Sequence, residues 1–297
     1  MRRRFVTLDV FTETRFAGNP LAVVLEPDGL DTAAMQTIAR EFNFPETVFV
    51  FAPENSANRA RLRIFTPTRE LPFAGHPTVG TAVLLGRLDG ASAREFVLEE
   101  KIGLVPCRVE PLTADSGRAQ FDLPRLPEPA GRVGSNAAIA AALSLKPDDI
   151  GFDDFTPAFW SAGNPFAFVP LASLDAMRRC RAVEADWNAA FGTDSHNAAY
   201  MFCRQTEDGN DFHARMFAPR YGIAEDPATG SAAAAFAGLL AARHDRADGE
   251  HLVRIEQGYE MGRPSLMELT LKIAGGKLTG AAIGGVAVVV SEGMIEA

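Results

Sequence analysis

The sequence is poor in the residues that build disulfide or metal frameworks. Its 297 residues include three cysteines, Cys107, Cys180 and Cys203, which are scattered along the chain. An odd number at such spacing fits neither a disulfide framework nor a zinc site, so we expect reduced thiols of the kind found in the cytoplasm. The five histidines lack metal-ligand spacing as well. We therefore predict no bound metal.

Long apolar runs and positive charge are also lacking. No apolar run reaches about 18 residues before a charged residue or a glycine interrupts it, which argues against a membrane-spanning helix. Residues 5–11 are typical of a strand and not of the apolar core of a signal peptide. The net charge of −9 argues against a nucleic-acid-binding surface. These absences predict a cytoplasmic protein with neither a nucleic acid nor a membrane as partner.

Two enzyme signatures are missing. No glycine-rich loop follows a strand in the manner of a phosphate or dinucleotide site, so we predict no such cofactor. Ser231 lacks the nucleophile-elbow context of a serine hydrolase. Of the remaining enzyme chemistries, the residues favour acid–base catalysis.

Strands and helices alternate along the sequence. Residues 5–11, 21–25, 47–51 and 60–65 are rich in β-branched and alternating apolar side chains, which predicts strands. Asp31 or Thr32 caps a predicted helix with apolar residues spaced three, four and seven apart, and Pro45 closes it. Hairpins such as 96–112 indicate a mixed sheet or barrel, and so an α+β fold, in place of a purely parallel one.

Two segments predict helices buried on all sides. Residues 78–85 are apolar or small around the whole helix circumference, as is the helix that ends near Leu240. Proline and glycine are frequent between Leu123 and Gly134, where we place a domain boundary. We expect an N-terminal half at 1–127, completed by a C-terminal strand at about 284–297, and a C-terminal half at 128–283.

The second half repeats the first. Residues 16–24, Phe-Ala-Gly-Asn-Pro-Leu-Ala-Val-Val, resemble residues 161–169, and Arg63-Ile-Phe-Thr-Pro67 resembles Arg215-Met-Phe-Ala-Pro219. Because two matched segments follow in the same order, we infer a duplicated fold with pseudo-twofold symmetry. The natural ligand site of such a pair is the cleft between its halves.

The chemistry-bearing residues gather at the starts of the two buried helices. First-turn amides there could bind a carboxylate, and Gly75 and Gly230 would allow a close approach, although small residues also simply permit tight packing. Glu46 has apolar neighbours that could suit it to proton transfer, but an isolated glutamate is more often a turn carboxylate. Asp226 precedes the second helix and could equally be its N-cap. His76 is the histidine in an apolar, Gly- and Pro-rich segment.

Five ordered segments resemble the phenazine-biosynthesis PhzF-like family. They are 9–23 with Gly-Asn-Pro, 45–49 with Pro-Glu-Thr, 63–78 with Pro-Phe-Ala-Gly-His-Pro, 226–232 with Asp-Pro-Ala-Thr-Gly-Ser, and 257–265 with Gln-Gly and Met-Gly-Arg-Pro-Ser. The resemblance implies a diaminopimelate-epimerase-like fold. Each half would then be a mixed sheet or barrel around a central buried helix. It also implies a homodimer.

The resemblance further implies which residues act. Related amino-acid epimerases carry one cysteine at each helix start, but here Gly75 and Asp226-Pro227 stand in those places, so a two-thiol racemase mechanism is excluded. Glu46 would act as the acid/base, with His76 and Asp226 orienting the substrate or relaying protons. Substrate contacts would come from Asn19, Gly75, Gly230 and Ser231.

The sequence therefore predicts a cofactor-independent isomerase. It would move a proton on a small carboxylated metabolite, which in the family's best-known member is a cyclic dihydro-hydroxyanthranilate. The alternative is a non-catalytic protein that kept the fold and binds a small carboxylate. A purely structural protein gains little support, because no charge run or amphipathic arm is present.

Overall fold

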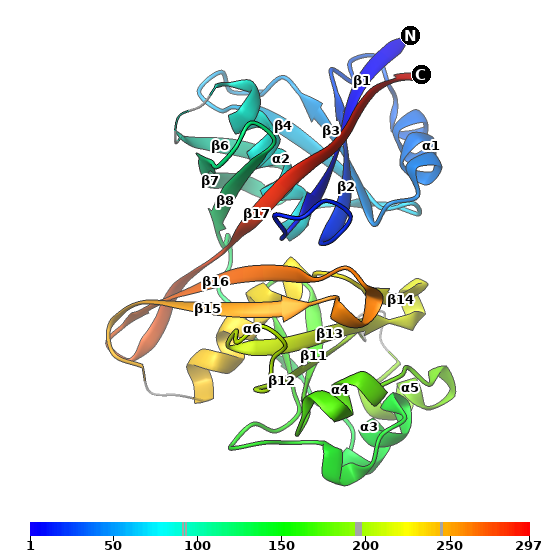
Figure 1. Cartoon of the computed structure of the whole chain (residues 1–297), viewed down its shortest axis with the longest axis vertical. Coiled ribbons are helices and arrows are strands. Elements are labelled where there is room, and N and C mark those ends of the chain that lie inside the picture. The colour runs from blue at the N-terminus through cyan, green and yellow to red at the C-terminus, as the bar shows by residue number, and fades with distance from the viewer. Residues whose placement is uncertain (91, 93, 194–197, 244–245) are drawn as a thin grey trace. The chain divides into compact units, whose positions relative to one another are not determined.

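The computed structural model describes residues 1–90, 92, 94–193, 198–243 and 246–297 (Figure 1). The chain divides into two compact units. Unit 1 comprises Met1–Pro124 and Ile283–Ala297, and unit 2 comprises Arg125–Ala282. Each unit is described by itself.

Unit 1 is an eight-stranded barrel. The pairing runs from β17 through β1, β2, β3, β4, β6, β7 and β8 and returns to β17, which closes the sheet. The first and last strands lie side by side, with Arg2 opposite Glu296, so both chain ends belong to this unit (Figure 1). The strands are β1 (Arg2–Val10), β2 (Asn19–Leu25), β3 (Glu46–Phe51), β4 (Ala60–Phe65), β5 (Glu70–Leu71), β6 (Arg94–Glu100), β7 (Gly103–Pro111), β8 (Ser116–Asp122) and β17 (Lys277–Glu296).

The helix α2 (Gly75–Leu88) fills this barrel and packs against β1, β2, β3, β7 and β8. Every residue from Gly75 to Gly86 is buried, which confirms the predicted buried helix and extends it at its N-terminal end. Close packing depends on Gly80, because a Cβ there would lie 2.6 Å from Leu21 Cδ2 and 2.7 Å from Val10 Cγ2. The glycine therefore lets the helix approach β1 and β2 closely.

The helix α1 (Thr32–Phe42) covers the outer side of the barrel. Of the two predicted caps, Asp31 is the N-cap and accepts a hydrogen bond from Ala34 N at 2.8 Å, while Thr32 is the first residue of the helix. Its apolar face packs on Phe49 and Phe65. Asn43, with φ 52°, ends the helix in the left-handed conformation, and the chain then enters β3 at Glu46.

Unit 2 is built from a second mixed sheet. Strands pair in the order β9, β10, β11, β12, β13, β15 and β16, and the central helix α6 packs against β9, β10, β11 and β16. The elements are β9 (Glu128–Gly131), β10 (Ala158–Ser161), β11 (Pro165–Pro170), β12 (Ala198–Cys203), β13 (Phe212–Ala218), β14 (Ile223–Asp226), β15 (Gly249–Gln257), β16 (Ser265–Ala274), α3 (Asn136–Leu143), α4 (Leu174–Arg179), α5 (Glu184–Phe191), α6 (Gly230–Arg243), η1 (Pro147–Asp149), η2 (Pro219–Tyr221) and η3 (Tyr259–Met261).

Both units contain the same succession of strand pairings. The pairs β2–β3 and β11–β12 are parallel, β3–β4 and β12–β13 are antiparallel, and β4–β6 and β13–β15 are parallel. In register, Arg61 lies opposite Glu99 and His213 lies opposite Glu256. Residues of the two units can therefore be matched position by position.

Within the described ranges, no helix is both long enough and apolar enough to cross a bilayer.

Candidate active site

His76 sits in the first turn of α2 and is fixed by the neighbouring strand β2. Its side chain is 6% exposed. Nε2 has no hydrogen-bond partner among the described residues, so Nδ1 makes the bond to the backbone of Pro20. A proline has no N–H, so the acceptor is its carbonyl oxygen and Nδ1 carries the proton. Nε2 is left with its lone pair.

Glu46 lies beside this lone pair. It is the first residue of β3, opposite Leu21 of β2, and its Oε2 stands 3.3 Å from His76 Nε2. The Glu46 side chain is 16% exposed, so the carboxyl is largely desolvated yet reachable. The hydrogen bond of His76 to Pro20 and the register of β2 with β3 together place the imidazole next to the carboxyl. The structure thus brings together two of the predicted catalytic residues.

Burial keeps His76 neutral. It lowers the pKa of His76 to about 3, and the bond to Pro20 offsets only part of this effect. At neutral pH the ring is therefore an uncharged imidazole whose Nε2 can accept a proton or a hydrogen bond, but cannot serve as a cation. This tautomer suits a partner that gains a proton during the reaction.

Asn19 and Gly75 complete the predicted site residues of unit 1. Asn19 begins β2 and is fully buried, one residue before the Pro20 that holds His76. Gly75 begins α2, and the preceding Ala74 has no side chain that could cap the helix. The start of α2 therefore presents backbone amides of the kind that bind anions.

In unit 2 a chain of hydrogen bonds leads to Asp226. Gln257 Nε2 donates to Asp226 O at 2.7 Å and to Thr229 Oγ1 at 3.1 Å, and Thr229 Oγ1 donates to Asp226 Oδ2 at 2.6 Å. The amide of Gln257 thereby directs the Thr229 hydroxyl proton toward the carboxylate. Asp226 ends β14 and is held before the helix by its contact with Thr229.

Gly230 and Ser231 form the first turn of α6. Gly230 is buried and Ser231 is half-buried. Unit 2 thus brings Asp226, Gly230 and Ser231 together at one helix start, as unit 1 does for Glu46, His76, Asn19 and Gly75.

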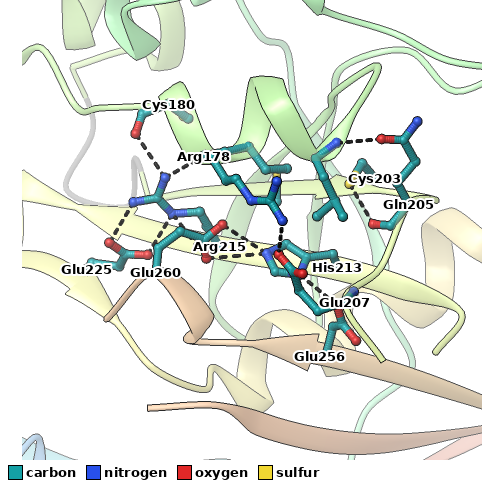
Figure 2. A network of polar contacts seen from close by, with 12 residues as sticks. Arg178, Cys180, Cys203, Gln205, Glu207, His213, Arg215, Glu225, Glu256 and Glu260 are labelled. Atoms are coloured by element: carbon teal, nitrogen blue, oxygen red, sulfur yellow. Dashed lines mark hydrogen bonds and ion pairs between the residues drawn. The ribbon is translucent and has the colours of Figure 1, made fainter. Parts of the chain in front are cut away.

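A second polar cluster in unit 2 joins β13, β15 and η3 (Figure 2). His213 Nδ1 lies 2.8 Å from Glu256 Oε1, and its Nε2 lies 3.1 Å from Glu260 Oε1. Burial alone would lower the pKa of His213, but the two carboxylates outweigh it and raise the pKa to about 9. Arg215 forms a two-pronged ion pair with Glu225 at 2.7 and 2.8 Å. The charged groups of this cluster bind one another, so we interpret the cluster as one that stabilises the fold of unit 2.

Thiol and metal chemistry find little support. All three cysteines are buried, and burial raises the pKa of Cys180 and Cys203 to about 12 and that of Cys107 further still. In the part of the chain that the structure describes, no group of His, Cys, Asp and Glu could hold a metal ion. His196 and His244 lie outside the described residues.

Sequence reasoning missed the residues that support the helix starts. Thr229 and Gln257 bind Asp226, and in unit 1 Thr78, in the first turn of α2, contacts Glu100 on β6. Gln257 lies in one of the recognised segments, but the sequence alone does not reveal that its amide reaches Asp226 across 31 residues. The internal repeat is the signal that could have found Glu100.

The chain is similar to known proteins over nearly its whole length. Residues 8–293 match the PhzC-PhzF family, described as phenazine biosynthesis-like protein. An uncharacterized isomerase of Mesorhizobium japonicum is 50% identical over 99% of this chain and 98% of its own. A trans-2,3-dihydro-3-hydroxyanthranilate isomerase of Pseudomonas fluorescens is 37% identical over 89% of this chain and 88% of its own.

Solved structures agree with these matches. A Bacillus anthracis phenazine biosynthesis protein of the PhzF family has a TM-score of 0.90 and 26% identity, with 100% of both chains covered. A hydroxyproline epimerase from Agrobacterium vitis has a TM-score of 0.59 and 13% identity, with 99% of this chain and 92% of the other covered, and shares the fold alone. The chain therefore belongs to the PhzC-PhzF family of phenazine biosynthesis-like proteins and is an isomerase.

Proposed function

We propose that the protein is a cofactor-independent isomerase that moves a proton on a small carboxylated metabolite, with Glu46 as the acid/base. The observation that carries the proposal is the pair of Glu46 and neutral His76 at 3.3 Å. A relative's name points to a cyclic substrate, trans-2,3-dihydro-3-hydroxyanthranilate, and this compound is the first to try. We further propose that the chain consists of two related halves, each with a diaminopimelate-epimerase-like fold.

His76 would assist Glu46 when Glu46 takes a proton. When the Glu46 carboxylate takes a proton from a substrate carbon, the new carboxylic acid can donate a hydrogen bond to the Nε2 lone pair. The neutral imidazole can therefore assist the step by accepting that hydrogen bond. A positioned acid/base of this kind contributes on the order of 10²–10⁴-fold.

Backbone amides would bind the substrate carboxylate. The first turn of α2 near Gly75 and the first turn of α6 near Gly230 and Ser231 are helix starts, where the dipole and the first N–H groups favour an anion. We assign Asn19 to substrate contact and Asp226 to substrate orientation or proton relay. We further propose that the protein is a homodimer and that it acts in the cytoplasm.

The test is solvent exchange. We expect the purified protein in heavy water to introduce deuterium into trans-2,3-dihydro-3-hydroxyanthranilate or a related cyclic carboxylate, and Glu46→Gln to slow this by at least about 100-fold. Glu41→Gln changes an exposed glutamate of α1 and should exchange at the wild-type rate. Equal rates for wild type and Glu46→Gln would refute the role of Glu46.

The alternative is a non-catalytic carboxylate binder. It predicts that the same compounds raise the melting temperature by binding to the folded state while no deuterium enters them. Under that alternative Glu46→Gln would change affinity alone.

A further inference from the structure

The hydroxyl of Thr78, in the first turn of α2, contacts two other oxygen atoms. Thr78 Oγ1 lies 2.8 Å from the Ala74 carbonyl oxygen, one helical turn back, and 2.7 Å from Glu100 Oε1 on β6. Both distances are normal for O–H···O hydrogen bonds. His76 belongs to the same helical turn, two residues before Thr78.

Two protons are needed for both contacts to be hydrogen bonds, and Thr78 supplies one. A threonine hydroxyl has a single hydrogen, and a backbone carbonyl accepts but never donates. If Thr78 donates to Ala74, the 2.7 Å contact with Glu100 requires a proton on Glu100. Both contacts are therefore hydrogen bonds if Glu100 is a neutral carboxylic acid that donates to Thr78.

Burial leads to the same protonation state independently. Glu100 is 8% exposed, and its second oxygen, Oε2, is buried with no hydrogen-bond partner among the described residues. An ionised carboxylate with an unpartnered buried oxygen is costly, whereas a carboxylic acid carries no charge to solvate. Burial accordingly raises the pKa of Glu100 to about 8, against a smaller opposing effect of Thr78.

The internal repeat allows Glu100 to be compared with a residue of unit 2. Glu99 lies opposite Arg61 in unit 1, and Glu256 lies opposite His213 in unit 2. The next residues, Glu100 and Gln257, are therefore equivalent. Gln257 donates from its amide to the hydroxyl of Thr229, as Glu100 would donate to Thr78. A protonated glutamate has the same shape and neutral charge as a glutamine.

We propose that Glu100 is held as a neutral carboxylic acid that donates its proton to Thr78, and that it positions the first turn of α2, which carries His76. The chain of bonds runs from Glu100 through Thr78 to the Ala74 carbonyl and fixes the residue before the helix. Glu100 acts through this turn and is a positioning residue. Its effect on catalysis rests on the proposed function of His76, whereas its protonation state does not.

The charged groups near Glu100 are few and mostly paired. Arg63 on β4 is bound in a two-pronged ion pair to Glu70 on β5 at 2.8 and 2.9 Å. Lys101 follows Glu100 in the chain, and both residues line a groove of about 710 Å³. On β7, burial raises the pKa of the Cys107 thiol, so this group carries no charge at neutral pH.

The other acidic groups on the neighbouring strands have partners of their own. Glu99 points to the loop that precedes β4 and accepts hydrogen bonds from Glu54 N and Asn55 N. Asp122 on β8 pairs with Arg108. Burial and the contact with Thr78 are the two causes of the Glu100 pKa shift, and no cation among the described residues contributes to it.

Infrared spectroscopy tests the protonation state directly. At neutral pH, the wild-type protein minus Glu100→Gln difference spectrum should contain the C=O band of one protonated carboxylic acid, which disappears as the pH is raised through about 8. Glu95→Gln removes an exposed carboxyl from the same strand and should leave that band in place. A difference spectrum that shows a carboxylate band instead would overturn the proposal.

Unfolding equilibria supply a second test. The folded-state pKa lies above the ordinary value of 4.5, so folding is favoured by the bound proton at low pH, and this advantage is lost as the pH rises toward about 8. The unfolding constant of wild type relative to Glu100→Gln should therefore rise by about tenfold per pH unit over that range. Parallel pH profiles for the two proteins would contradict the proposal.

Exchange kinetics test the positioning role. Glu100→Gln keeps a donor and should retain activity within about threefold, whereas Glu100→Leu keeps the volume but loses the donor and should lower activity by about tenfold. Wild type should also lose activity above the pKa of Glu100, and Glu100→Gln should not. Equal activity of the two variants would overturn positioning. An inactive wild type would refute the proposed function while leaving the infrared result to decide the protonation.

Discussion

Raising the pH from about 6 to about 10 should weaken unit 2 through a single residue, His213. Its ring is completely buried between the carboxylates of Glu256 and Glu260. Glu256 in turn accepts hydrogen bonds from two backbone N–H groups and from Asn210 in the loop between β12 and β13. The protonated imidazole therefore joins β13, β15 and η3 to this loop (Figure 2).

The size of the effect follows from the pKa. The folded-state pKa of His213 is raised from 6.5 to about 9. A raised histidine pKa means that the folded state binds the proton more tightly, so the stabilisation is complete below the ordinary pKa and is lost as the pH rises through about 9. The difference between the two values corresponds to about 3 kcal/mol.

The assay compares three proteins across this pH range. Hydrogen exchange of the amides of β13 and β15 reports the local opening free energy of unit 2. Wild type should lose about 1.4 kcal/mol per pH unit relative to His213→Gln between about pH 6.5 and 9, and no more above that. His251→Gln, which removes a histidine on the same strand as Glu256 but outside the cluster, should follow wild type.

The refuting result is equally specific. If wild type and His213→Gln lose stability in parallel from pH 6 to 10, the folded state binds the His213 proton no more tightly than the unfolded state does, and the two carboxylates do not raise its pKa. A wild type that gains stability relative to His213→Gln as the pH rises through about 6.5 would mean that burial outweighs the two carboxylates and lowers the pKa of His213.

Three further predictions concern the helix starts and the thiols. Nitrogen NMR of His76 should show a neutral ring with the proton on Nδ1 from neutral pH down to about pH 4, and a charged ring at neutral pH would contradict its burial. Gly80→Ala should lower stability by about 1–3 kcal/mol, because the added methyl group overlaps Leu21, and a melting temperature equal to that of wild type would show that α2 can shift freely. A thiol reagent at neutral pH should react with the folded protein far more slowly than with the unfolded protein, since burial raises the pKa of each thiol, and rapid labelling of the native state would refute this for Cys107, Cys180 and Cys203.

Local chemistry made the framework of unit 1 predictable. Asp31 caps α1 because a short acidic side chain accepts the amide of Ala34, and this contact spans three residues. The buried α2 followed from a run without a polar face. Closure of the sheet by β17 required a pairing between chain ends, such as Arg2 with Glu296, which the sequence merely suggested through its last apolar run.

The polar contacts of the helix starts were beyond such reasoning. Glu46 and His76 are 30 positions apart, and their distance depends on the bond of His76 to Pro20 and on the register of β2 with β3. His213 read as an ordinary strand residue, because its two carboxylate partners lie more than 40 positions further along the chain. Periodicity identifies faces of strands and helices, but long-range pairing decides which polar atoms meet.

The repeat explains how one framework can carry two different groups. In both units an arginine holds a glutamate in a two-pronged ion pair. Arg63 on β4 binds Glu70, and Arg215 on the matching strand β13 binds Glu225. In both units a glutamate accepts the amides of the loop that precedes this strand. These shared contacts fix the backbone.

The difference between the units lies at the end of each hydrogen-bond chain. In unit 2 the amide of Gln257 directs the Thr229 proton onto Asp226 Oδ2, which accepts it. In unit 1 the contacts of Thr78 end on the carbonyl of Ala74, while the pair of Glu46 and His76, which we propose as catalytic, is positioned separately by β3 and Pro20. A duplicated scaffold therefore supplies equivalent positions, and single residues at those positions determine whether a helix start holds a carboxylate or a neutral imidazole.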